Sequence, residues 1–204
     1  MNSPILELTL PEQQLSLFFP LLRQGVDVVT RPGQTVHAFL HRDLGLSEKV
    51  IQSRVQTVFL NGQPADELSK THLGQGDVLT LSAAMPGLLG ACMRVDSPYA
   101  AMRDTISKDR AEQQWSRTGR ETIRFTLKLF NFMAAEVGPY VCKQGMILDK
   151  DRVLDLLETS TVQALRADGA QLFLDGRLQD PVQESLSARL EQAETVFLRI
   201  VSKE

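Results

Sequence analysis

One five-residue pattern, apolar-Phe-Leu-(Asn/Asp)-Gly, occurs twice in the sequence. The first copy is Val58–Gly62 and the second is Leu172–Gly176, an offset of 114 residues. An apolar run that ends in Asn-Gly or Asp-Gly is a strong hairpin signal, because the favoured two-residue turn needs positive φ at both positions. The pattern therefore predicts a strand followed by a tight turn at both places.

The sequence around the two copies repeats in the same order. With the same offset, Phe39–Leu40 aligns with Val153–Leu154, and Val78–Leu81 matches Val196–Ile200 after about four inserted residues. The order hairpin, helix, strand with turn, polar stretch and strand thus occurs twice. We predict an α+β protein of two tandem domains, residues 1–92 and 120–204, with a connector at 93–119 that contains some helix.

The start of the first half predicts a strand, a turn and a returning strand. Ile5–Leu10 is apolar enough for a strand, and Val26–Thr30 is rich in β-branched residues, which pack well on a pleated surface. Gly25 allows the tight turn before the second of these strands. Pro20 argues against a regular helix through Leu15–Leu22.

A helix is expected next. Thr35 is a suitable N-cap, and Gly45 suits the position just after a helix. Between them, apolar residues fall at helical spacing and predict one buried stripe: Val36, Phe39, Leu40 and Leu44. A second short helix is expected at Glu48–Arg54.

The second half predicts a similar set of elements. Ile123–Phe130 alternates apolar and polar residues, which is typical of a half-buried strand. Gly138 and Pro139 predict a turn, after which Val141–Leu148 is expected to return as a strand. The remaining expected elements are a helix with Val153, Leu154, Leu156 and Leu157, a helix over 180–192 and a last strand at Thr195–Val201.

The first half also carries a family resemblance. Gly33–Val36 opens the helix, Val58–Gly62 follows, and Thr71, Leu73, Gly76 and Asp77 precede the strand Val78–Leu81. This order resembles the ubiquitin-like β-grasp superfamily and, within it, the small sulfur-carrier proteins of the thiamine and molybdopterin pathways. The resemblance covers about residues 5–91. It implies a mixed sheet packed on one main helix in each half.

The sequence departs from the sulfur carriers at one decisive place. Those proteins end in a free Gly-Gly tail, whose carboxylate becomes the reactive thiocarboxylate. Here the first half runs into Pro86–Ala91 and the chain continues, while Val201–Glu204 contains no glycine. We therefore expect no sulfur-carrier chemistry.

Sequence signals for catalysis and metal binding are weak. No Gly-x-Ser-x-Gly motif, phosphate-binding glycine loop or Rossmann fingerprint occurs. His37 and His41 have the spacing of two metal ligands on a helix, but no third ligand is evident beside them. Cys92 and Cys142 are too few for a thiolate cluster or a disulfide scaffold and are expected to be buried thiols. We predict no metal and no cofactor, and we lean against an enzyme.

Charge and hydropathy limit the partners. A formal charge of -3 and a pI near 5.7 argue against a dedicated nucleic-acid binder. The N-terminus lacks the basic start of a signal peptide, and the longest uncharged stretch, Val78–Met93, is shorter than the ~20 residues of a spanning helix. We expect a cytoplasmic protein that has no membrane contact.

The most unusual segment is Met85–Met93, which is apolar, rich in glycine and directly follows a strand. Such a loop suits partner docking, because glycines allow close backbone approach; the alternative is a buried turn. The leading hypothesis is a non-enzymatic binding or adaptor protein that acts through protein–protein contacts. The candidate partner-binding residues are Pro86, Gly87, Leu88, Leu89, Gly90 and Arg94.

Other functions and modes of association remain open from the sequence. One alternative is an enzyme with a cleft between the two halves. Another is an RNA-associated β-grasp module, which would use Arg117, Arg120 and Arg124 of the connector region. Sheet edges offer a route to a homo-oligomer.

Overall fold

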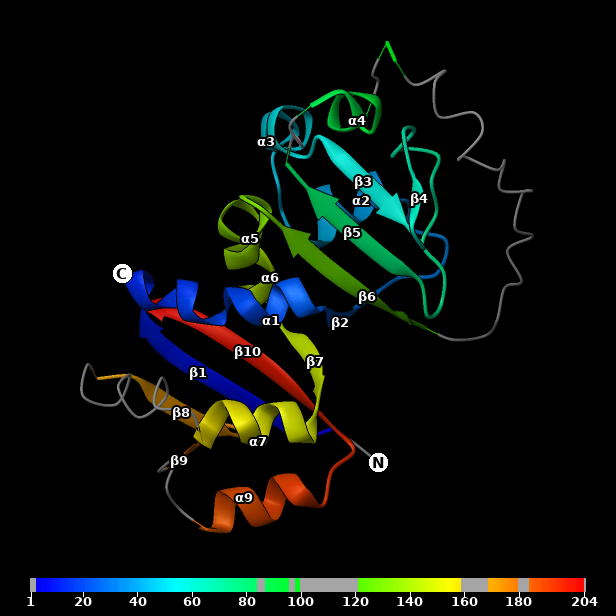
Figure 1. The fold of residues 1–204 in the computed structure, drawn as a ribbon. Helices are drawn as coiled ribbons and strands as arrows, with labels where there is room; N and C mark the ends of the chain where they lie inside the picture. Colours follow the sequence, from blue (N-terminus) through cyan, green and yellow to red (C-terminus); the bar gives the residue numbers. More distant parts are fainter. Residues whose placement is uncertain are drawn as a thin grey trace. The chain divides into compact units, whose positions relative to one another are not determined.

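The computed structural model describes residues 3–83, 87–95, 98–99, 121–158, 169–179 and 184–203. The fold is mixed α+β (Figure 1). The chain divides into two compact units. Unit 1 combines Met1–Leu21 with Pro139–Glu204, and unit 2 is the continuous segment Leu22–Gly138.

The described part of unit 2 contains five strands in the order β4-β3-β5-β6-β2. The two central strands, β5 and β6, are parallel, with Val78 opposite Thr126. The other neighbours are antiparallel. The strands are β2 (Val26–Thr30), β3 (Thr57–Leu60), β4 (Gln63–Pro64), β5 (Val78–Ser82) and β6 (Ile123–Phe130).

The helices of unit 2 follow the predicted signals. The Thr35 hydroxyl accepts a hydrogen bond from the backbone N–H of Ala38 and caps α2 (Val36–Ala38), which continues as the π-helical turn η2 (Phe39–Asp43). The stripe from Val36 to Leu44 is buried, and the Phe39 ring meets the Phe125 ring edge-on at 5.0 Å. The predicted second helix is confirmed as α3 (Glu48–Arg54). Periodicity and caps thus specified the local structure here.

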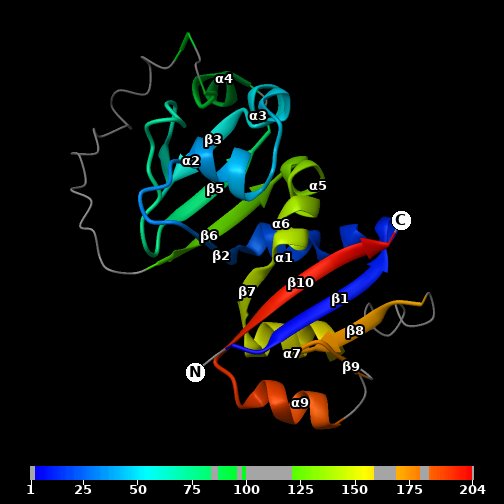
Figure 2. The ribbon, with the colours of Figure 1, turned by 180° about the vertical axis from the view of Figure 1, so that it is seen from behind.

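Among its described residues, unit 1 also has five strands, in the order β7-β10-β1-β8-β9 (Figure 2). Two of its strands, β1 and β10, are parallel neighbours. β7 pairs antiparallel with β10, β8 with β1, and β9 with β8. The strands are β1 (Ile5–Pro11), β7 (Met146–Asp149), β8 (Gln171–Leu174), β9 (Arg177–Gln179) and β10 (Thr195–Lys203).

Helices cover the sheet of unit 1. The 3-10 helix η1 (Glu12–Phe18) packs on β1 and β10, and α7 (Lys150–Glu158) packs on β7, β10 and α9 (Glu184–Glu191). Helix α1 (Phe19–Gln24) crosses the division between the units. The buried side chains of this core include Leu6, Leu8, Leu10, Phe18, Val141, Met146, Val153, Leu172, Leu186, Val196, Leu198 and Ile200.

The predicted pairing of Ile5–Leu10 with Val26–Thr30 is wrong. Both strands exist, but β1 pairs with β10 and β8, whereas β2 pairs with β6. A helical segment, η1 and α1, separates β1 from β2 in place of a tight hairpin turn. The compact units therefore divide the chain differently from the predicted domains 1–92 and 120–204. The connector 93–119 lies mostly outside the described residues.

The prediction of a strand over Val141–Leu148 is correct only for its second part. Residues before Gly145 form α6 (Gly138–Gln144), which follows α5 (Met133–Glu136). Met133, Val137 and Val141 are all fully buried. Their spacing of four residues places them on one face of a helix, which explains the helix in place of the predicted strand.

The two Asx-Gly turns are confirmed. Asn61 and Gly62 have φ of 52° and 76°, and Asp175 and Gly176 have φ of 49° and 77°. These are the positive values that a type I′ turn requires. The alternation predicted for Ile123–Phe130 is confirmed as well, because buried and half-buried positions alternate along β6.

Candidate functional site

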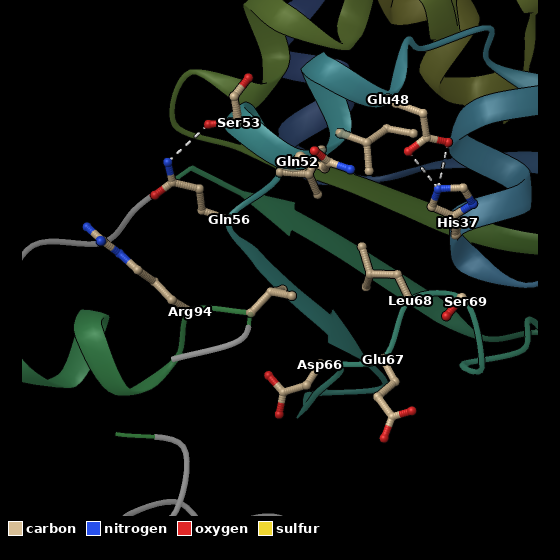
Figure 3. A pocket seen from close by; sticks show the side chains of 13 residues that line it. His37, Glu48, Gln52, Ser53, Gln56, Asp66, Glu67, Leu68, Ser69 and Arg94 are labelled. Atoms are coloured by element: carbon tan, nitrogen blue, oxygen red, sulfur yellow. Dashed lines mark hydrogen bonds and ion pairs between the residues drawn. The ribbon is translucent and has the colours of Figure 1, made fainter. Parts of the chain in front are cut away.

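A cavity of about 570 Å³ opens in unit 2 (Figure 3). Its walls come from four places in the sequence: α3 with the residues after it, the turn 66–69, the segment that follows α4 (Gly87–Cys92), and His37 of α2. The lining residues are His37, Glu48, Ile51, Gln52, Ser53, Val55, Gln56, Asp66, Glu67, Leu68, Ser69, Arg94 and Val95.

Helix α3 supplies the first wall. The Ser47 hydroxyl accepts from the backbone N–H of Val50 at 3.4 Å and caps the helix. Glu48 and Gln52 stand four residues apart on the helix and both line the cavity. Ile51 is buried and anchors the same helix in the core. The first wall is therefore a short, capped helix with a polar lining.

Main-chain hydrogen bonds fix the turn 66–69 as the second wall. The Leu68 carbonyl accepts from the backbone N–H of His37 at 3.0 Å, which ties the turn to the start of α2. The Glu67 carbonyl accepts from the N–H of Lys70 and of Thr71. The Glu67 carboxylate pairs with the Lys70 ammonium, and this hydrogen bond raises the pKa of Lys70. Both backbone and side chain of the turn are thus held in place.

The third wall is the segment after α4. The Val95 backbone N–H donates to the Gln56 carbonyl at 2.8 Å, which places this segment beside the end of α3. The Gln56 side chain is held in turn, because its Nε2 donates to the Ser53 carbonyl at 3.1 Å. Arg94 is exposed and borders the cavity.

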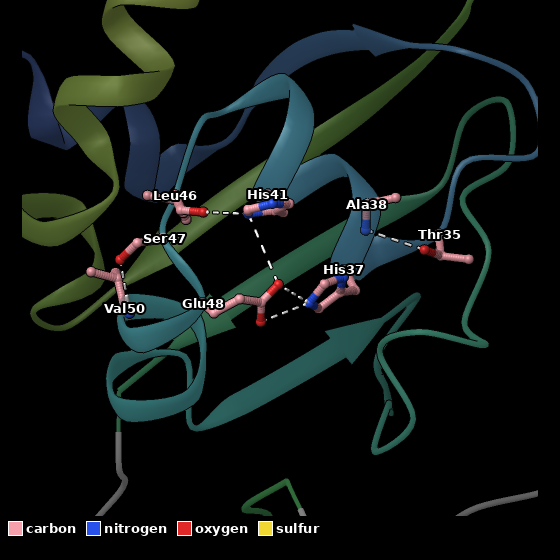
Figure 4. A network of polar contacts seen from close by, with 8 residues as sticks. All are labelled: Thr35, His37, Ala38, His41, Leu46, Ser47, Glu48 and Val50. Atoms are coloured by element: carbon pink, nitrogen blue, oxygen red, sulfur yellow. Dashed lines mark hydrogen bonds and ion pairs between the residues drawn. The ribbon is translucent and has the colours of Figure 1, made fainter.

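Two histidines meet one carboxylate beside the cavity (Figure 4). His37 Nε2 lies 3.0 Å and 3.1 Å from the two carboxylate oxygens of Glu48, so it donates to that carboxylate. His41 Nδ1 lies 2.9 Å from the Leu46 carbonyl and must carry a proton, because a carbonyl oxygen only accepts. The same Nδ1 lies 3.9 Å from Glu48. The network therefore orients His37 and specifies the protonated nitrogen of each ring.

Within the described residues, no group of three or more His, Cys, Asp and Glu side chains is placed to hold a metal ion. Both cysteines are buried, and loss of solvation raises the pKa of Cys142 to about 12. The Cys142 thiol therefore stays protonated at neutral pH and is a poor nucleophile or metal ligand. In the same part of the chain, no helix has the length and apolar character to cross a membrane.

The predicted partner-binding residues lie in different parts of the structure. Pro86 lies outside the described residues, and Gly87–Leu89 belong to α4, so a helix replaces the expected loop. Gly90 is buried. Arg94 lines the cavity. Cys92, the last residue of this helix, is buried as well.

The arginines predicted for RNA association are not assembled into a described patch. Arg117 and Arg120 lie outside the described residues. Arg124 is in β6, where its Nε donates to Asp27 Oδ2 at 2.7 Å. Its charge is therefore already paired within the sheet.

Sequence reasoning missed most of the cavity. The spacing of Glu48 and Gln52 on a predicted helix was an available signal for a polar helix face. No local signal connected that face with Leu68 or Arg94, because the contacts join segments that are distant in sequence. The chain matches no protein-family model, and no curated protein or solved structure is significantly similar to it.

Proposed function

We propose that this chain is a non-enzymatic binding protein that acts through protein–protein contacts, and that the cavity beside Arg94 receives a short extended segment of the partner. The observation that carries the proposal is a cavity of about 570 Å³ in which main-chain hydrogen bonds join the segment after α4 to Gln56 and the turn 66–69 to His37. Ligand-binding pockets in proteins usually have volumes of roughly 300–1,000 Å³ and are largely formed before the ligand binds. A few residues of a peptide fit this size.

The lining suits a peptide better than a purely apolar ligand. Gln52 and Gln56 present amides, which both donate and accept hydrogen bonds as a peptide backbone requires. Ile51, Val55 and Leu68 provide apolar surface between them. This mixture offers hydrogen bonds to a backbone and contacts to its side chains.

The two glutamates of the cavity lining already have partners within the protein. Glu48 is paired with His37, and Glu67 with Lys70. Arg94 at the border brings a cation to a lining that also contains Asp66. Hydrogen bonding and shape, more than net charge, therefore support recognition here.

Site-specific photocrosslinking tests the proposal. A benzophenone amino acid at Gln52, inside the cavity, is expected to capture one partner segment in cells, identified by mass spectrometry. The matched control is Gln63, an exposed glutamine of the same unit outside the cavity. Arg94→Ala is expected to reduce the Gln52 adduct. Equal adducts at Gln52 and Gln63, or no adduct at Gln52, would contradict the proposal.

Acid–base chemistry is a second candidate, supported by the His37–Glu48 pair. A carboxylate that fixes one imidazole nitrogen leaves the other available as a base. Model esters and phosphoesters test this candidate by comparison of the protein with a His37→Gln variant. A rate that falls in the variant supports catalysis, and equal rates remove the candidate.

The relation to the β-grasp superfamily is part of the proposal. It is supported by the order strand, helix, strand, strand, strand from β2 to β5, and by the helix stripe that packs on β6 through Phe39 and Phe125.

A further inference from the structure

The sheet of unit 1 is completed by a strand from the other end of the sequence. β1 lies between β8 and β10, and both views show it beside β10 (Figures 1 and 2). It pairs with β10 from Ile5 to Pro11 and with β8 from Leu6 to Thr9. Leu6, Leu8 and Leu10 are 4% exposed or less. β1 is therefore a full member of the core of unit 1.

We call the position between an antiparallel neighbour and a parallel neighbour the slot of each sheet; β1 occupies it in unit 1, and β5 occupies it in unit 2. β5 lies between antiparallel β3 and parallel β6, as β1 lies between antiparallel β8 and parallel β10. In unit 2, however, β5 arrives directly from β4 within one continuous segment. In unit 1, β1 precedes the whole of unit 2 in the sequence, whereas the other strands of its sheet follow unit 2.

The hydrogen bonds at the start of the two slots match one for one. Asn61 Oδ1 accepts from the Val78 N–H at 2.7 Å, and Asp175 Oδ1 accepts from the Ile5 N–H at 2.9 Å. The Asn61 N–H donates to the Val78 carbonyl, and the Asp175 N–H donates to the Ile5 carbonyl, both at 2.8 Å.

The parallel neighbour adds a third matching bond. The Thr126 N–H donates to the Asp77 carbonyl at 2.8 Å, and the Phe197 N–H donates to the Pro4 carbonyl at 2.9 Å. The slot is therefore defined by the Asx-Gly turn and the parallel strand. Besides the first residue of the inserted strand, these bonds use only the residue directly before it, Asp77 or Pro4.

We propose that the slot of unit 1 accepts β1 from a second copy of the chain, so that two copies exchange their β1 segments. The exchanged strand would make the same hydrogen bonds and bury the same leucines as in the single chain, because donor and slot are identical. Exchange of an identical element is a low-cost route to a dimer. The segment to be exchanged ends within α1, where the division between the units falls.

Cysteine pairs test the exchange. Glu7 and Arg199 are opposite residues of β1 and β10, and their side chains are 38% and 46% exposed. Neighbouring strands lie ~4.8 Å apart, within the range that a disulfide spans. Chains with Glu7→Cys are co-expressed with chains that carry Arg199→Cys, then oxidised and separated on a non-reducing gel. Each variant alone gives the baseline of random crosslinking.

The matched control uses the slot of unit 2. Thr80 and Lys128 are opposite residues of β5 and β6, which belong to one continuous unit. We expect a covalent dimer well above baseline from the Glu7→Cys and Arg199→Cys mixture, and none above baseline from Thr80→Cys with Lys128→Cys. A Glu7→Cys and Arg199→Cys mixture at baseline overturns the proposal. A dimer by light scattering without that crosslink overturns it in favour of pairing through sheet edges.

Discussion

Asn61 Nδ2 donates a hydrogen bond to Asp77 Oδ1 at 2.7 Å. Asp77 is 8% exposed, and its other oxygen accepts from the Gly74 N–H at 2.7 Å. The amide of Asn61 thus brings a donor to a nearly buried carboxylate. In the second copy of the motif Asp175 occupies the matching position, and the residue that corresponds to Asp77 is Pro4. The difference between Asn and Asp in the two motifs follows from these neighbours.

Substitution of Asn61 by Asp and of Asp175 by Asn should change the unfolding free energy by unequal amounts. Asn61→Asp removes the donor and places a second carboxylate against Asp77, so we expect a loss of about 2–3 kcal/mol of unfolding free energy, as for a buried charge left without its partner. Asp175→Asn keeps the acceptor for the Ile5 N–H and should change stability by less than about 1 kcal/mol. Urea unfolding measures both. Equal losses would show that Asp77 does not distinguish the two turns.

Gly145 cannot carry a side chain where it lies. Its φ is +103°, and a Cβ would stand 2.2 Å from the Cζ atom of Phe197. Gly145→Ala should therefore combine backbone strain with overpacking, each about 1–3 kcal/mol. Thermal unfolding under reversible conditions measures the loss.

The matched control for this change is Gly25, which has a similar φ of +110°. There a Cβ would stand 3.0 Å from Cε of Lys128, a flexible side chain that is able to move, and 3.0 Å from Cγ2 of Thr126. Gly25→Ala is expected to be the milder change. A larger loss for Gly25→Ala than for Gly145→Ala would contradict the role given to Phe197.

The buried Cys142 thiol should make stability depend on alkaline pH. Burial raises the pKa of Cys142 to about 12, whereas an unfolded thiol ionises near about 8.5. Between these values the unfolded chain loses a proton that the folded chain keeps, so stability falls by up to about 1.4 kcal/mol per pH unit as pH rises. Below the unfolded pKa this group adds no pH dependence.

Urea unfolding from pH 8 to 10.5 measures this slope in the protein and in Cys142→Ala. The variant should have a shallower slope, since it lacks the titrating group, while the other titrating groups are the same in both proteins. Identical slopes would mean that the Cys142 thiol ionises equally in the folded and unfolded chains.

The histidine network specifies tautomers. In their neutral forms, His37 should carry its proton on Nε2, which faces Glu48, and His41 on Nδ1, which faces the Leu46 carbonyl. Two-bond proton–nitrogen correlation spectra distinguish the two forms. Glu48→Gln is expected to leave the His41 tautomer unchanged, because the Leu46 carbonyl fixes it. A neutral His41 with its proton on Nε2 would exclude the hydrogen bond to Leu46.

The sequence by itself determined the local structure of much of the chain. Thr35 caps a helix, Ile51 anchors the predicted α3, and Asn61 and Asp175 take the left-handed conformation of their turns. Each of these features depends on side chains within about four positions, and the periods of helix and strand express such contacts directly. These local features can therefore be predicted from the sequence without knowledge of the tertiary structure.

Only the tertiary structure decided which strands pair and where the cavity lies. β1 and β10 both bury every second side chain, so the same alternation fits either strand to several neighbours. The placement of β1 beside β10 and of β2 beside β6 depends on contacts between distant segments. Arg94 likewise reaches the cavity through the bond from Val95 to Gln56, a contact that no local period encodes.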